Sequence, residues 1–155
     1  MANICENHSQ NYSSLNKSYS FIKSQNFRGY KISETMNCCL YLKCGTLQLD
    51  ECRLSLASYS NPSSVVPCIV VEKDGILIVN RSELRGTDGT IGIVCKGGQV
   101  IVKESVIKDH GGAGIMMIGK KKTNLVIKNS SISSCLEGIV LNGPFSAIID
   151  NNTII

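Results

Sequence analysis

The chain has 155 residues, of which 43% are hydrophobic and 18% charged, so it can form one folded domain and is not disordered overall. Aromatic residues make up only 5%, so the core must be built from aliphatic side chains and cysteine, a composition that favours strands. The net charge of +4 falls well short of a nucleic-acid-binding profile.

The N-terminal residues show no export signal. Residues 1–8 lack the basic and apolar regions of a signal peptide, and no apolar run approaches the ~18 residues of a membrane span. Residues 1–19 are polar and rich in Asn and Ser without periodicity, which predicts a flexible or irregular segment. The domain is predicted over residues 20–155.

Cysteine is frequent in this chain. The eight cysteines are Cys5, Cys38, Cys39, Cys44, Cys52, Cys68, Cys95 and Cys135. Without an export signal, buried thiols are expected rather than disulfides, and the expected location is the cytoplasm. The group at 38–44 contains no Cys-x-x-Cys pair and no nearby histidine, so neither a metal site nor a cofactor is predicted.

A template recurs from about residue 20. Two apolar residues alternate, a small polar residue follows three positions later, and another apolar residue comes two after that. The clear copies are Leu47, Leu49, Cys52, Leu54; Leu77, Val79, Ser82, Leu84; Val100, Val102, Ser105, Ile107; Leu125, Ile127, Ser130, Ile132; and Ala147, Ile149, Asn152, Ile154, with a weaker one at Ile22, Gln25, Phe27. Equal spacing in five copies indicates a repeat architecture.

A short apolar run between two glycines precedes most copies, at residues 92–97, 114–119 and 138–143. The copies stand about 23 residues apart, and a longer step is explained by an outward insertion at 57–66. Alternating runs at this spacing leave no room for a helix. The sequence therefore predicts an all-β parallel β-helix, a solenoid of about five to six coils whose C-terminal coil has no cap.

The template also predicts what each position does. Apolar positions should stack inside as ladders of like residues. The small polar position should lie at an inward bend and hydrogen-bond the next coil. The repeated glycines should adopt turn dihedrals that other residues avoid, and residues 119–123 should form a second outward turn.

The repeated unit resembles the right-handed parallel β-helix repeat of the pectin lyase-like superfamily. The matching positions are Gly92-Ile93, Gly114-Ile115 and Gly138-Ile139 with residues 127–132 and 149–154, and the likeness covers residues 38–155. It implies a right-handed coil. The superfamily includes polysaccharide lyases, glycoside hydrolases and epimerases, and also non-catalytic intracellular modules such as those of F-box and SHC-binding proteins. Coils with cysteines and no export signal are more similar to the second set.

One turn carries the candidate catalytic residues. Asp88, His110 and Ser134 each stand four residues before a repeated glycine, with Arg85 and Asp109 close by. If these positions stack on one outer face, Arg85, Asp88, Asp109 and His110 could supply a general acid and base. The segment 109–112 is similar to the Gly-His-Gly of polygalacturonases, whose other acidic motifs are absent. The competing interpretation is ordinary solvated turn residues.

Two further motifs have simpler explanations. Residues 114–120 match the outline of a phosphate-binding loop, but Lys121 stands where Ser or Thr is needed and a strand is expected next. Lys120–122 and neighbouring lysines make the C-terminal half basic. A solubilising loop is favoured over an anion contact, and nucleic acid is unexpected without interleaved aromatics.

Three functional hypotheses follow. The leading one is a non-catalytic β-helix module that acts as a rigid scaffold for another protein. The second is a carbohydrate-active or carbohydrate-binding fragment, for which a polysaccharide is the partner. The third is end-to-end assembly through the uncapped last coil, or a chain that is a piece of a longer protein. No membrane partner is expected in any of them.

Overall fold

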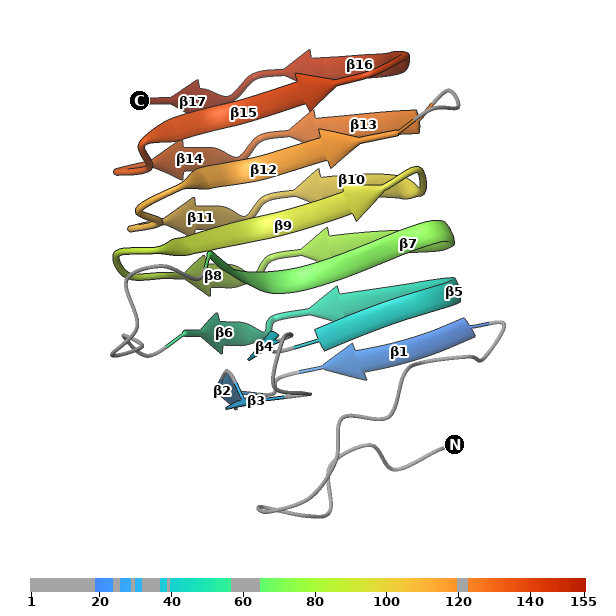
Figure 1. Ribbon diagram of the computed structural model, residues 1–155, viewed down its shortest axis with the longest axis horizontal. Coiled ribbons are helices and arrows are strands. Elements are labelled where there is room, and N and C mark those ends of the chain that lie inside the picture. Colours follow the sequence, from blue (N-terminus) through green and yellow to red (C-terminus); the bar gives the residue numbers. More distant parts are fainter. Residues whose placement is uncertain are drawn as a thin grey trace.

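The alternating template folds into strands that wind as a parallel β-solenoid (Figure 1). The computed structural model describes residues 19–23, 26–28, 30–31, 37–38, 40–56, 65–119 and 123–155, with side chains from residue 38 onward. Every regular element in these ranges is a strand. The prediction of an all-β solenoid is therefore confirmed.

Each full coil contributes strands to three faces. One coil consists of β9 (Thr90–Lys96), β10 (Gln99–Lys103) and β11 (Val106–Lys108). The next two consist of β12 (Ala113–Ile118), β13 (Thr123–Lys128) and β14 (Ser131–Ser133), then β15 (Glu137–Asn142), β16 (Phe145–Asp150) and β17 (Thr153–Ile154).

In the two preceding coils one long strand serves the first two faces. These coils are β5 (Leu40–Asp50) with β6 (Arg53–Ser55), and β7 (Val66–Asn80) with β8 (Glu83–Arg85). Ahead of them lie β1 (Tyr19–Lys23), β2 (Asn26–Arg28), β3 (Tyr30–Lys31) and β4 (Asn37–Cys38).

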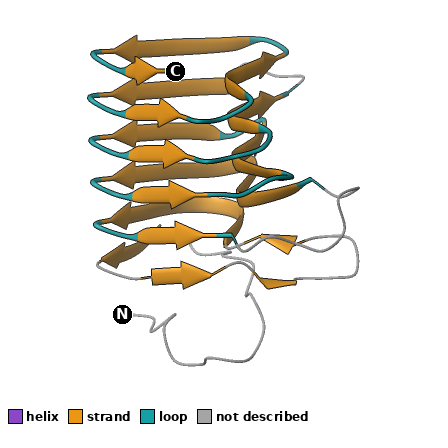
Figure 2. Cartoon of the chain, turned by 90° about the vertical axis from the view of Figure 1, so that its left-hand side faces the viewer, coloured by secondary structure: helices purple, strands orange, loops and turns teal. Residues whose placement is uncertain are grey.

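The strand register follows the template. Val102 pairs with Val79 on one side and Ile127 on the other, so equivalent template positions stack from coil to coil. The third strands stack in the same way in a second sheet, from β2 to β17 (Figure 2). Even the weak first copy is in register, since Ile22 pairs with Leu49. These inward positions form the buried core.

The number of complete turns is slightly lower than the predicted number of coils. Register leads from Leu40 through Ile69, Ile93 and Ile115 to Ile139, which is about four turns over the described part of the chain rather than five to six. The prediction counted every copy of the template as one complete coil. In the structure, a turn runs from one copy to the next, so there are fewer turns than copies. Ahead of residue 40, β3 and β4 pair antiparallel and add no parallel face.

The small polar position forms the predicted hydrogen-bonded ladder. The Ser82 N–H donates to Ser105 Oγ at 3.0 Å, and the Ser105 N–H donates to Ser130 Oγ at 3.2 Å. The Ser105 hydroxyl donates in turn to the carbonyl of Lys103 at 2.6 Å. The sequence did not reveal the left-handed backbone just before each serine, such as φ 49° at Glu104.

The glycines play two roles where one was predicted. Gly97 and Gly143 have φ values of 92° and 117°, as expected for turns. Gly92 and Gly114 lie outside the positive-φ region, so the prediction is wrong for them. They are small because the next coil approaches closely: a Cβ on Gly114 would lie 2.8 Å from the Gly138 carbonyl oxygen.

Several predictions fall on residues that the structure does not describe. These are the N-terminal segment before Tyr19, most of the insertion at 57–66, and residues 120–122. The domain boundary at residue 20 stays a prediction. Among the described residues, no helix is long and apolar enough to cross a membrane.

Candidate functional site

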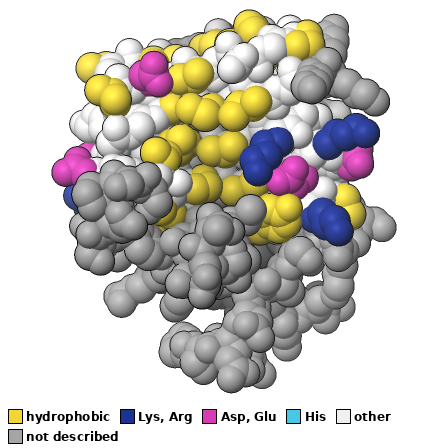
Figure 3. All heavy atoms as spheres, in the orientation of Figure 1, with side chains coloured by type: hydrophobic (Ala, Val, Ile, Leu, Met, Phe, Trp, Pro, Cys, Tyr) yellow, Lys and Arg dark blue, Asp and Glu magenta, His cyan; other side chains and the backbone are white. Residues whose placement is uncertain are grey.

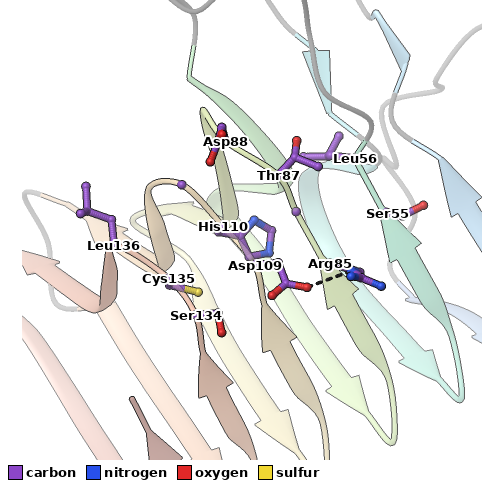
Figure 4. Close-up of a pocket in the computed structure, with 12 residues that line it drawn as sticks. Ser55, Leu56, Arg85, Thr87, Asp88, Asp109, His110, Ser134, Cys135 and Leu136 are labelled. Carbon is purple, nitrogen blue, oxygen red and sulfur yellow. Dashed lines mark ion pairs between the residues drawn. The ribbon is translucent and has the colours of Figure 1, made fainter.

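The four candidate residues line one pocket at the bends that lead from a third strand into the next coil (Figure 4). The pocket is open and has a volume of about 850 Å³. Four neighbouring coils contribute to it: the lining residues are Ser55, Leu56, Arg85, Gly86, Thr87, Asp88, Asp109, His110, Gly111, Ser134, Cys135 and Leu136.

Arg85 and Asp109 form an ion pair between neighbouring coils. Arg85 ends β8 and Asp109 follows β11, which places the guanidinium Nε 2.9 Å from Oδ2 of the carboxylate. Figure 4 shows the two side chains pointing toward each other. The Arg85 side chain remains 61% exposed, so the pair is surface-like. It occupies a carboxylate oxygen that general acid–base catalysis would need.

His110 lies inside the solenoid and is only 1% exposed. Its Nδ1 lies 3.0 Å from the hydroxyl oxygen of Thr90. That hydroxyl donates its only proton to the Thr87 carbonyl at 2.6 Å, so it must accept from the ring, and we assign the proton of the neutral ring to Nδ1. The other ring nitrogen, Nε2, is buried without a hydrogen-bond partner.

This environment opposes protonation of the ring. Burial lowers the pKa of His110 from 6.5 to about 4, because a charged imidazole would lose its hydration inside the coil. At neutral pH the ring is therefore uncharged. Its Nε2 points toward Gly92, since a Cβ on Gly92 would lie 3.2 Å from it. The lone pair thus faces the interior of the coil.

The predicted outer row of Asp88, His110 and Ser134 is wrong for His110. Asp88 and Ser134 are exposed, whereas His110 is buried. Gly111 stacks on Asp88 instead, since a Cβ on Gly111 would lie 2.8 Å from the Asp88 Cα.

A one-residue difference between strands causes the error. On the third face, Leu84 pairs with Ile107, 23 residues further along the chain. On the first face, Ile93 pairs with Ile115, only 22 residues further along. When the coils are aligned on the glycines of the first face, the residues of the preceding bend are therefore displaced by one position.

Sequence reasoning missed the partners of His110. Thr90 is 1% exposed and holds the ring, and a Cβ on Gly86 would collide with both side chains. Alignment on Leu84, Ile107 and Ile132 would have placed Thr87, His110 and Cys135 at equivalent positions. No pattern in the sequence marks Gly86 and Thr90, because neither belongs to a repeated ladder.

Cys135 is the thiol that lines the pocket. Burial raises its pKa, so the thiol stays protonated at neutral pH. Its Sγ lies 3.3 Å from the Ser133 carbonyl oxygen, to which it donates. Cys135 and the buried Cys95 carry free thiols, as the prediction of thiols rather than disulfides expects at these two positions. A protonated thiol in this setting is a poor nucleophile.

The described residues give little support to a metal site or a phosphate-binding loop. The described residues contain no group of three or more His, Cys, Asp or Glu side chains that could hold a metal ion. In the loop-like motif at 114–120, Gly114 belongs to β12, and the next element is the strand β13, as expected. Lys120 lies outside the described residues.

Comparison of the chain with known protein-family models, with curated proteins and with solved structures finds no match. The likeness to the pectin lyase-like repeat therefore remains an interpretation of the sequence, and the structure supports it at the level of a parallel β-solenoid.

Proposed function

We propose that the chain is a non-catalytic β-solenoid module of the pectin lyase-like type, and that it serves as a rigid cytoplasmic scaffold for another protein. The observation that carries the proposal is an apolar cluster on the outward side of the first face, in which Ile91, Val94 and Ala113 are buried and Met116 and Val140 are partly exposed. We call it the front patch, and it consists of Ile91, Val94, Ala113, Met116 and Val140.

The front patch is separate from the core. Val94 pairs with Met116, and Met116 pairs with Val140, so the three stack across neighbouring coils. Their chain neighbours Ile93 and Cys95 belong to the interior cluster, whereas Val94 belongs to the outer one. Figure 3 shows hydrophobic side chains in rows across this face. The partly exposed members, Met116 and Val140, support a surface that meets another protein.

A polar edge borders the patch. Lys96 Nζ lies 3.3 Å from the Glu72 carboxylate, and the Tyr41 hydroxyl donates to the same oxygen at 3.3 Å. Together they place charged and aromatic groups beside the apolar rows, as a protein interface does with its rim. Because the strands hold all these residues at fixed spacing, little conformational entropy would be lost on binding.

Proximity labelling in cells that express the chain tests this proposal. We expect Met116→Lys with Val140→Lys to remove a set of labelled proteins, because two ammonium groups would have to be buried with the patch. The control is Val126→Lys, which places one ammonium group on a different outer face. If all three forms label the same proteins, the front patch is not the docking surface.

A carbohydrate-active role is the second candidate, favoured by the convergence of Arg85, Asp88, Asp109 and His110 on one pocket. The ion pair and the burial of His110 leave Asp88 as the exposed acid among them. We expect no turnover of polyuronates and no signal on a glycan array. Turnover that is abolished by alanine at Asp88, Asp109 and His110 would establish the enzyme and end the scaffold proposal.

A further inference from the structure

A second outer surface carries its own apolar row, on the face formed by β7, β10, β13 and β16. We call it the back ladder, and it consists of Ile78, Ile101, Val126 and Ile148. Strand register places these four residues directly above one another in successive coils. In β10 the pattern of burial alternates, so that Val100 and Val102 are buried while Ile101 between them is partly exposed.

The exposed part of the ladder is aliphatic and β-branched. Ile78, Ile101 and Val126 are partly exposed, and Ile148 lies in β16, where every residue is exposed. Outward positions of a solvated strand are ordinarily polar. The front patch lies on a different face of the solenoid, so the proposed scaffold function does not account for this row.

The spacing of the ladder matches that of a second copy of the chain. Its side chains repeat once per coil, at the ~4.8 Å distance between paired strands. A second copy of this chain has the same row at the same spacing, so residues can meet one to one when two such faces pack, about 10 Å apart. We propose that the chain forms a two-fold dimer through the back ladder.

The residues beside the ladder favour one of two possible two-fold arrangements of the dimer. On one side of it lie Asn80, Lys103, Lys128 and Asp150, and on the other lie Ile76, Gln99, Asn124 and Ser146. A two-fold axis parallel to the strands would place Lys103 opposite Lys128 of the second copy, where the like charges repel. An axis parallel to the solenoid reverses the strand direction instead.

In this second arrangement every coil faces its own equivalent. Lys103 then meets Gln99 of the second copy, and Lys128 meets Asn124 of the second copy. Each ammonium group can donate to an amide oxygen, and like charges are kept apart. The dimer therefore has two solenoids side by side, with their axes in the same direction and their strands antiparallel across the interface.

Sedimentation velocity on the full chain tests the dimer. We expect the sedimenting species to have the mass of two chains at about 100 μM, a concentration at which even a weak dimer is populated. Val126→Lys should raise the dissociation constant at least about tenfold, since it buries a charge at the centre of the interface. Because position 126 faces outward, the thermal melt of this variant should match that of the native chain at a concentration low enough for both to be monomeric. Met116→Lys with Val140→Lys is the matched control and should dimerise normally.

A second variant tests the orientation. Gln99→Glu should tighten the dimer about tenfold at low salt, because a carboxylate then faces Lys103 of the second copy twice per dimer, and the gain should vanish at high salt. A monomeric native chain at this concentration, an unchanged dissociation constant for Val126→Lys, or no tightening by Gln99→Glu overturns the proposal. None of these results bears on the front patch, because its test measures which other proteins are labelled in cells.

Discussion

Two bends of the same coil bury polar groups in different ways. At the bend into the third strand, the serine ladder repeats one arrangement, in which each hydroxyl accepts from the coil before it and donates to the carbonyl two residues earlier in the chain. At the bend out of the third strand, His110 buries a ring only once, and its Nε2 has no partner.

The contrast shows what repetition does for a buried polar group. In the ladder, the neighbouring coil presents a complementary group, because it carries a small polar residue in the same register. At the histidine bend each neighbour is different: Gly86 leaves space on one side, and Thr90 supplies a single acceptor. The pocket opens at this bend, where the repeat is irregular.

The largest effect is expected where the irregular bend is tightest. Gly86→Ala adds a methyl group that would collide with the His110 ring and the Thr90 hydroxyl. We expect a loss of about 4 kcal/mol in the free energy of unfolding, from overpacking together with the broken Thr90–His110 hydrogen bond. Urea denaturation measures the change.

A double-mutant cycle tests the cause of that loss. His110→Ala is itself destabilising, but it empties the space that the new methyl group needs. The double variant should therefore be more stable than the sum of the two single losses, with a coupling of about 2 kcal/mol. Additive losses would show that the ring does not confine Gly86.

The pH dependence of stability comes next in size. The pKa of His110 is lowered to about 4 in the folded chain and has its ordinary value of 6.5 when unfolded. As pH falls from about 6.5 to about 4, the unfolded chain takes up a proton that the folded chain refuses, so stability falls by about 3 kcal/mol over that window. Below it the loss levels off. Denaturation curves at a series of pH values measure this.

His110→Gln is the control for the pH series. It keeps a polar side chain in the bend but removes the titrating ring, so its stability should change much less between those pH values. The histidine account is wrong if both forms lose stability equally, since the carboxylates common to both would then dominate.

The same contrast explains what the sequence could predict. The template positions of Ser82, Ser105 and Ser130 recur with fixed spacing, so both their inward bend and their hydrogen bonds were predicted and are confirmed. The parallel sheets and the core followed from the same repeat. A pattern seen five times constrains a structure because each copy must fit the coil above and below it.

The histidine bend offered no such pattern. His110 was predicted to face outward because residues were aligned on Gly92 and Gly114, whose strand steps by 22 residues, whereas Leu84 and Ile107 step by 23. A one-residue shift exchanges inside and outside. The buried Thr90 contact depends on that shift and on the missing Cβ of Gly86, neither of which a single sequence displays.

The smallest effect is expected in the ladder itself. Ser105→Ala removes the acceptor of the Ser82 N–H and leaves that buried group without its hydrogen bond, which should cost about 2 kcal/mol in the free energy of unfolding. Ser105→Cys is the matched control, because Cys52 occupies this position one coil earlier than Ser82 and its Sγ donates to the Asp50 carbonyl at 3.4 Å.

We expect the cysteine variant to lose about half as much as the alanine variant, since sulfur is a weak acceptor that still offers the N–H a partner. Urea midpoints for the two variants measure the difference. Equal losses would mean that the cost comes from the reshaped bend. No loss in either would mean that the ladder, for all its regularity, contributes less to stability than the single histidine contact.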